Sequence, residues 1–474
     1  MFRIPVRLFR VFRIENTDAK QLFTYFVATL SRLQRINLMT HETILDQVVQ
    51  HEQCCCCGLC AAVCPTQRLA VRETEFGEFF PAGECTESCG MCLKVCPVET
   101  AQQRAGDCVA DHYQTFVGGV SQDSERLKAP SGGFATAMLC RLLEENKIDA
   151  AIVAAPTTER PWFERRIATT TEEILQSRGS VYHVLKNDDV LREVLNGPDR
   201  RYAIVALPCM AKAIRLAQET IPKLKQRIRY IFGLTCGGCN TLHVPDLLTV
   251  MLGNRQAELR YRSKQNSKTA RDFSVALFDH PQRRAVRMLG AFGFLWINHV
   301  GQLTSCLYCN DVFAEYADAT FMDAWLPEYI PDARGTSLAI SRSAELTEMF
   351  EAMFRDGTLQ GGTIEPERVR ESQESLIEER QRHHRIFSAL ASARAADASP
   401  PVNADDLQWG KRYLAFHNDM RKLFRYYSHR LARRPNWYSR FYIIRIFWLT
   451  FLSLLRHRLL KKTMQSLHFL KKKG

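Results

Sequence analysis

Two runs of cysteine near the amino terminus have the spacing with which proteins bind iron–sulfur clusters. The first run is CCCCGLCAAVCP, from Cys54 to Pro65, and the second is CTESCGMCLKVCP, from Cys85 to Pro97. In such a run three thiolates surround one four-iron cluster, and the fourth, which precedes a proline, binds the neighbouring cluster. Zinc sites or disulfides are the alternative for eight thiols in this order. The spacing favours two four-iron clusters, so we expect electrons to pass through this protein.

The order of the cysteines assigns four ligands to each cluster. The first cluster is expected to take Cys54, Cys57, Cys60 and Cys96. The second cluster is expected to take Cys85, Cys89, Cys92 and Cys64. The second run has one residue more than the common spacing, and Cys55 and Cys56 crowd the first run. A shift of one residue in the choice of ligands therefore stays open.

Five more cysteines lie in the middle of the chain, where strand and helix patterns alternate. They are Cys209, Cys236, Cys239, Cys306 and Cys309. Apolar runs at 148–155, 203–207 and 228–234 predict buried strands, and the last two end just before the first three of these cysteines. The alternation predicts an α/β sheet, whose ligands bind beyond the carboxyl ends of its strands. The thiols could converge on a third cluster, a zinc ion or a dithiol switch, and spacing alone does not choose.

The segment PSGGFAT, from Pro130 to Thr136, opens a helix predicted over 132–146. Ser131 can cap this helix, and the two glycines let a ligand approach backbone amides that point outward. A phosphate would be favoured there, although Ser-Gly-Gly before a helix is more often only a cap. The glycine-rich loops typical of NAD or nucleoside triphosphate sites do not accompany it, which disfavours an NAD-type Rossmann site.

The formal net charge of +13 comes from the carboxyl-terminal segment. Residues 421–474 contain fifteen Lys or Arg and no Asp or Glu, which leaves the rest of the chain at −2. The apolar stretch FYIIRIFWLTFLSLL, at 441–455, is shorter than the roughly 20 residues of a spanning helix and contains Arg445. It is typical of an interfacial helix over anionic lipid, and a helix that docks on a partner subunit is the alternative. Its aromatic residues form no stacking platform, so we expect no nucleic acid.

The chain divides into five segments. They are a basic helical leader (1–50), an iron–sulfur module (51–107), an alternating domain (108–374), a helix with a linker (375–420) and a basic amphipathic tail (421–474). The leader carries arginines on one predicted helical face, either a second surface anchor or a solvated basic face: Arg3, Arg7, Arg10 and Arg13. Seventeen cysteines without a secretory signal predict a cytoplasmic protein, peripheral on the inner membrane face if the tail binds lipid.

Residues 54–345 resemble the coenzyme F420 hydrogenase/dehydrogenase beta subunits. The resemblance rests on the cysteine runs and on six further motifs in the same order. These are SGGFAT (131–136), RGSVY (178–182), LPC (207–209), GLTCGG (233–238), YRSK (261–264) and CLYCNDVFAEYADATFMDAW (306–325). Relatives of that family include reductases of the chlorophyll 7-hydroxymethyl group and of the chlorophyllide 8-vinyl group, besides archaeal subunits that reduce the deazaflavin coenzyme.

The resemblance implies an FAD held by the alternating domain and fed by iron–sulfur clusters. The implied flavin contacts are Ser131, Gly132, Gly133, Thr136, Ser180 and Tyr182. The implied ligands of a third cluster are Cys209, Cys236, Cys306 and Cys309, with Cys239 outside the pattern. Asp323 is a further candidate, although Met322 stands where relatives usually have glycine. For a proton donor the nearest residues are His183 and Lys186, and a histidine in such a place is more often structural.

We therefore expect an α/β flavin-binding domain with an amino-terminal two-cluster ferredoxin-like module and a helical basic tail. The function expected is an iron–sulfur flavoprotein oxidoreductase that passes electrons between ferredoxin-type clusters and FAD, and on to coenzyme F420 or an organic substrate. Its partner would be a ferredoxin or a redox subunit. The alternative is an electron-transfer subunit of a larger membrane-associated complex, without an organic substrate of its own.

Overall fold

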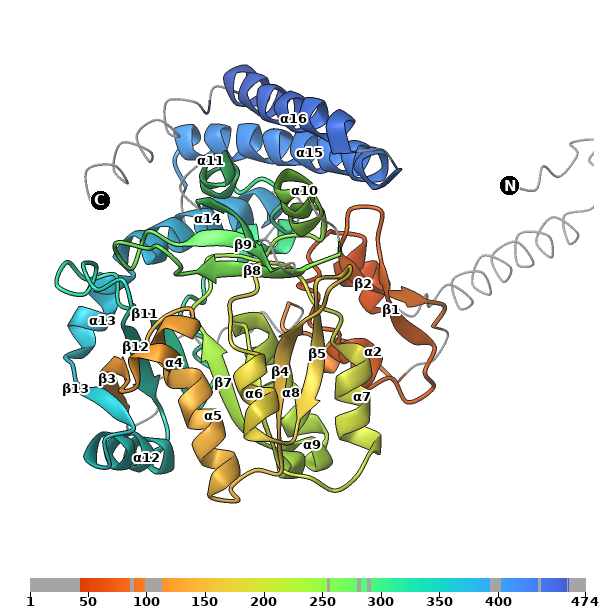
Figure 1. Cartoon of the computed structure of the whole chain (residues 1–474). Helices are drawn as coiled ribbons and strands as arrows, with labels where there is room; N and C mark the ends of the chain where they lie inside the picture. The colour runs from red at the N-terminus through yellow and green to blue at the C-terminus, as the bar shows by residue number, and fades with distance from the viewer. Residues whose placement is uncertain are drawn as a thin grey trace, which may run out of the picture.

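The computed structural model describes most of the chain. The described residues are 43–85, 89–98, 113–253, 256–278, 283–287, 291–392, 402–433, 436–457 and 459. The four arginines predicted to form a basic helical face in the leader lie outside them, as does the greater part of the leader. Within the described residues the protein has a mixed α/β fold built around one large sheet (Figure 1).

That sheet has eight strands in the order β13-β3-β12-β11-β7-β6-β4-β5. Their bounds are β3 Gln114–Val120, β4 Ala150–Pro156, β5 Phe163–Ala168, β6 Tyr202–Ala206, β7 Ile228–Leu234, β11 Ala319–Asp323, β12 Ser337–Ser341 and β13 Leu359–Thr363. Strands β4, β6, β7 and β11 run parallel, and the flanking strands are antiparallel. The carboxyl ends of the four parallel strands therefore meet at one edge of the sheet.

Both faces of the central strands are buried. In β4, Ala150 and Ile152 pack in one apolar cluster with helices α7 (Asp188–Asn196) and α8 (Pro208–Thr220). The intervening residues of the strand pack in another cluster, with α5 (Phe134–Glu144) and α12 (Ala344–Arg355). Successive side chains of a strand point to opposite faces, so a strand covered on both faces must be apolar throughout. This explains why the strand appears in the sequence as an unbroken apolar run.

The iron–sulfur module folds against the edge of this domain, at the red end of the chain in Figure 1. It comprises the π-helical turn η2 (Leu45–Val49), the short helices α2 (Leu59–Ala62) and α3 (Met91–Lys94), and the antiparallel hairpin of β1 (Leu69–Glu73) and β2 (Phe79–Gly83). Leu59 and Ala62 of α2 enter the same apolar cluster as α7 and α8. The module is thus packed onto the large sheet domain rather than tethered to it.

A second layer lies over the carboxyl-end side of the large sheet (Figure 1). It contains the three-stranded sheet of β8 (Glu258–Ser263), β9 (Ser274–Phe278) and β10 (Arg283–Arg287), with helices α10 (His243–Leu252) and α11 (Ala291–Ile297). Three long helices complete it: α14 (Glu374–Ser392), α15 (Ala404–Arg433) and α16 (Asn436–Arg456). The boundary that we placed after residue 420 falls inside α15, whose Phe416, Phe424 and Tyr427 belong to one core cluster. The tail is therefore built into the body of the protein.

The remaining described helices are short connections around the sheet. They are α4 (Asp123–Lys128), α6 (Thr171–Gln176), α9 (Pro222–Arg227), α13 (Pro366–Ser372) and the 3-10 turn η3 (Thr304–Tyr308). In the described part of the chain, no helix combines the length and the apolar character needed to cross a membrane.

Candidate functional site

One cavity of about 500 Å³ lies where the parallel strands end. The start of α5 lines it with Ser131, Gly133 and Thr136, and the loop before α7 contributes Ser180 and Tyr182. Asp323, at the end of β11, lines it too. Six of the seven residues predicted to contact a cofactor thus surround one space, whose size lies within the roughly 300–1,000 Å³ of small-molecule sites.

Gly132, the seventh predicted contact, does not line the cavity. A Cβ atom at this position would lie 2.3 Å from the carbonyl oxygen of Gly118 and 2.6 Å from the amide nitrogen of Ser337, both backbone atoms. Glycine is therefore required by the close approach of β3 and β12. Gly133 has a φ of +91° and forms the N-cap of α5, a left-handed conformation that favours glycine.

Ser131 does not cap α5, contrary to our prediction. Its hydroxyl donates a hydrogen bond to the carbonyl of Thr336 at 2.8 Å, and no side chain caps the helix. The first amides of α5 thus lack a side-chain acceptor at the end that faces the cavity. An anion bound there would meet both these donors and the positive end of the helix dipole.

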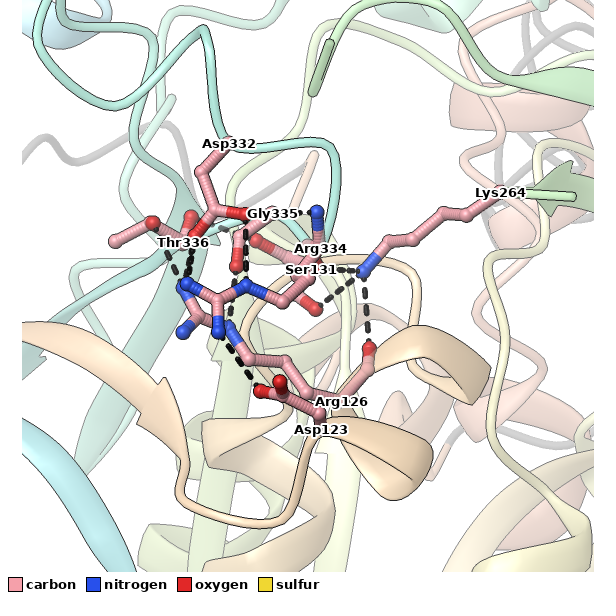
Figure 2. A network of polar contacts seen from close by, with 8 residues as sticks. All are labelled: Asp123, Arg126, Ser131, Lys264, Asp332, Arg334, Gly335 and Thr336. Atoms are coloured by element: carbon pink, nitrogen blue, oxygen red, sulfur yellow. Dashed lines mark hydrogen bonds and ion pairs between the residues drawn. The ribbon is translucent and has the colours of Figure 1, made fainter. Parts of the chain in front are cut away.

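A buried cationic clamp holds the Ser131 loop in place (Figure 2). The Lys264 ammonium donates to the carbonyls of Arg126 at 3.1 Å, of Ser131 at 2.7 Å and of Arg334. Arg126 donates to the Gly335 carbonyl at 2.8 Å and to the Thr336 hydroxyl at 3.0 Å. The clamp joins the end of α4, the Ser131 loop and the loop before β12. The Lys264 of the YRSK motif therefore supports the cavity wall from behind.

The cavity lining carries more positive than negative charge. Arg165, Arg178 and Arg262 line it, and Asp323 is the single acidic side chain in the lining. Asp323 pairs with Arg262 at 2.6 Å, which leaves the other two arginines to set the sign of the local field. Aromatic rings complete the wall, among them Tyr182, which packs edge-on to Trp296 with ring centroids 4.8 Å apart. A planar aromatic ligand that carries phosphate fits such a lining.

The cysteines of the middle domain converge at the opposite wall. Cys209, Cys236 and Cys239 line the cavity directly. Burial raises the pKa of the Cys306 and Cys309 thiols to about 11, and neighbouring thiols contribute: Cys309 acts on Cys306, and Cys236 on Cys309. Loops distant in sequence therefore bring these five sulfurs into one group, as the position of the strand ends suggested.

Backbone amides already point at two of these sulfurs. The N–H of Gly238 donates to the Cys236 sulfur at 3.4 Å, and the N–H of Cys239 donates to the Cys306 sulfur at 3.3 Å. Such N–H···S bonds stabilise thiolates and adjust the reduction potential of iron–sulfur clusters. Cys239, which we placed outside the ligand pattern, thus contributes an amide to the group, and its own thiol is buried beside Cys306.

Arg380 is a site residue that our sequence reasoning missed. Its guanidinium lies in α14, is only 2% exposed, and donates to the carbonyls of Cys306 at 2.7 Å and of Gly237. It therefore ties together the two loops that carry Cys236 and Cys306. No motif marks this arginine, because its partners are backbone atoms far away in the sequence.

Cys55 connects the iron–sulfur module to this group. Its thiol donates a hydrogen bond to the Cys209 sulfur, and Cys55 lines the cavity together with Cys56 and Cys57. We had treated Cys55 only as a neighbour that crowds the first run. The contact brings the first run to the wall of the cavity.

The cysteines of the two runs also group as we assigned them. Burial, followed by the nearby thiols of Cys57, Cys54 and Cys96, raises the pKa of Cys60 well above its usual range. Cys92 likewise lies near Cys85 and Cys89. In the described part of the chain no three His, Cys, Asp or Glu side chains surround a single metal-ion position. The donor set is thiolate throughout, which suits iron–sulfur clusters.

The two candidate proton donors are engaged elsewhere. His183 is buried, with Nδ1 2.8 Å from the Tyr261 hydroxyl and Nε2 3.0 Å from the Pro161 carbonyl. Burial lowers its pKa to about 4. Lys186 pairs with Asp189 and does not line the cavity. These contacts give both side chains structural roles, and their assignment as proton donors stays a prediction that the geometry does not support.

Sequence patterns of a known family match most of the sheet domain. The family is coenzyme F420 hydrogenase/dehydrogenase, beta subunit. Its amino-terminal pattern matches residues 115–192, and its carboxyl-terminal pattern matches residues 199–367. Together the two patterns cover the large sheet, the cavity and the cysteines that converge on it.

Individual proteins are similar over shorter stretches. A protein of the F(420)H(2) dehydrogenase of Methanosarcina mazei is 29% identical over 207 residues, which are 40% of this chain and 55% of that protein. The beta subunit of coenzyme F420 hydrogenase of Methanosarcina barkeri is 34% identical over 131 residues, which are 26% of this chain and 44% of that protein. The chain thus spans about half the length of these curated relatives.

A solved chain of the F420-reducing [NiFe] hydrogenase complex from Methanosarcina barkeri superposes with a TM-score of 0.44 and 18% identity. The match covers 60% of this chain and 95% of that one, and a score this low adds nothing to the assignment. The assignment rests on the two sequence patterns and on the relatives that share them. This chain belongs to the family of coenzyme F420 hydrogenase/dehydrogenase beta subunits.

Proposed function

We propose that this chain is an iron–sulfur flavoprotein oxidoreductase that passes electrons between clusters bound by cysteine and an FAD in the cavity. One observation carries the proposal: the same cavity is lined by the helix-opening Ser131–Thr136 segment and by Cys209, Cys236 and Cys239. A cofactor seated on the first wall would lie directly beside a cluster seated on the second. When bound, FAD exchanges electrons singly or in pairs, whereas a cluster carries one at a time.

The residues of the chain supply binding and orientation for these groups. The open amides of α5 and the guanidinium of Arg178 would hold phosphate oxygens. The aromatic wall formed by Tyr182 and Trp296 would contact a flat ring and exclude water from it. The Lys264 clamp would keep the Ser131 loop in the shape that this binding requires.

The arrangement also supplies a path for electrons into the cavity. The first cysteine run would hold a cluster through Cys54, Cys57 and Cys60 with Cys96, and the second run would hold another. Cys55 contacts Cys209, so the first run adjoins the thiols that would hold a third cluster. Electrons would therefore move from the module, past Cys209, to the cavity.

The names of the relatives suggest coenzyme F420 as the acceptor or donor, with an organic substrate as the other option. A ferredoxin or a partner redox subunit would exchange electrons with the module. We place the protein in the cytoplasm, because every cysteine in the described part of the chain is a free thiol.

The test is a reduction experiment on the full chain, purified without oxygen. Flavin absorbance is followed after adding reduced ferredoxin to one sample and reduced F420 to another. Cys209→Ser should slow bleaching of the flavin by ferredoxin at least about tenfold while reduction by F420 is retained, because only the cluster path is broken. Cys140→Ser, a half-buried thiol of α5 outside the cavity, is the matched control. Folded protein without flavin, or two variants with equal rates, would reject the proposal.

A further inference from the structure

Helix α16 has one face built into the protein and one face directed outward. Ile446, Thr450 and Leu454 are fully buried, and the first and last of them join the core cluster that includes α10 and α15. The helix is the outermost layer of the second layer in Figure 1, on the side remote from the large sheet. Its position is therefore fixed by packing, and it cannot reorient without breaking that core.

The outward face carries a stripe of large apolar side chains. These residues, which we call the outer stripe, are Phe441, Ile444, Trp448, Leu452 and Leu455. They recur every three or four residues, so they share one side of the helix. Ile444 is 68% exposed and Trp448 is 59% exposed. Contiguous exposed apolar residues of this size mark a surface that binds something.

The charges around the outer stripe have one sign. Between Asn436 and Arg456 the helix contains three arginines and no acidic residue, and Arg445 is exposed within the stripe itself. Asp419 of α15 is the nearest acid, and it already pairs with His457 at 2.9 Å. An apolar face that carries only cations is complementary to an anionic surface, and two copies of it would repel each other.

We propose that the outer stripe binds the surface of an anionic lipid bilayer, with α16 lying flat in the headgroup region. The 21-residue helix cannot cross the bilayer, because its other face is packed in the protein core and Arg445 lies at its centre. A flat helix instead immerses Trp448 and its apolar neighbours, while Arg445 and Arg456 extend toward lipid phosphates. This orients the large sheet and its cavity away from the membrane, as Figure 1 lets the reader follow.

Flotation of the full chain with vesicles tests the proposal. One set of vesicles contains phosphatidylcholine alone, and the other contains about one third phosphatidylglycerol. We expect binding to the anionic vesicles, weak binding to the neutral ones, and release in about 0.5 M salt. The double variant Ile444→Glu with Trp448→Glu should lower the partition coefficient at least about tenfold.

The matched control is Tyr113→Glu with Leu127→Glu, which adds the same charge at two exposed apolar residues, 43% and 47% exposed, outside α16. Circular dichroism and iron content verify that both variants fold. Equal binding by the two double variants would overturn the proposal, as would wild-type protein that floats with neither vesicle. Light scattering that shows a dimer abolished by the α16 substitutions would also overturn it, because the stripe would then be an interface between copies.

Discussion

Replacing Arg380 should detach two cysteine loops from each other. In Arg380→Met the carbonyls of Cys306 and Gly237 lose their donor in a place where the side chain is 2% exposed. Each buried acceptor left without a partner costs about 1–3 kcal/mol, so the free energy of unfolding should fall by about 2–6 kcal/mol. Arg380→Lys should recover part of this loss, because an ammonium can still reach one carbonyl.

The assay is denaturant unfolding of protein kept free of oxygen, together with the iron content of each variant. Arg385→Met, an exposed position on the same helix, is the control and should change the free energy of unfolding by less than about 0.5 kcal/mol. Loss of iron from the Arg380 variant, but not from the control, would link the arginine to the cysteine loops. Equal stability and equal iron content in both methionine variants would refute the reasoning.

Three further outcomes follow from particular contacts. Gly132→Ala should weaken FAD uptake at least about tenfold, because its Cβ would lie 2.3 Å from a β3 carbonyl, while Gly362→Ala, with nothing within 4 Å, should not. Because burial lowers the pKa of His183 to about 4, the unfolded chain takes up its proton first, and the stability contributed by this histidine should be lost as pH falls from about 6.5 to about 4. The loss is on the order of 2 kcal/mol at pH 5, and unfolding at pH 7 and pH 5 measures it; a flat profile in the wild type, with His183→Asn as reference, would contradict neutral burial. Cys60→Ser should remove about four irons per chain by chemical analysis, whereas Cys140→Ser should remove none; equal iron in the two would count against the ligand assignment.

Local patterns predicted the sheet elements well. The strand expected at 228–234 is β7, with the same bounds, and the strand expected at 148–155 is β4, shifted by one or two residues. Both are apolar runs buried on two faces, so their composition alone distinguishes them from their surroundings. The alternation of strands and helices also placed the cysteine loops at one edge of the sheet, where the structure has them.

Contacts between distant residues could not be predicted in this way. Ser131 looked like a helix cap, yet its hydroxyl donates to Thr336, more than two hundred residues later in the chain. Arg380 contacts backbone atoms only, and Cys55 becomes a neighbour of Cys209 only when the module packs on the sheet. The division at residue 420 failed because a basic composition describes the surface of α15 and not its buried residues.

The most direct test of the central claim is the content of iron and flavin in the full chain after purification without oxygen. The two cysteine runs predict about eight irons per chain, a filled third site would raise this to about twelve, and one FAD should be released on denaturation. Zinc in place of iron, or a folded protein that neither contains nor takes up FAD, would contradict the account.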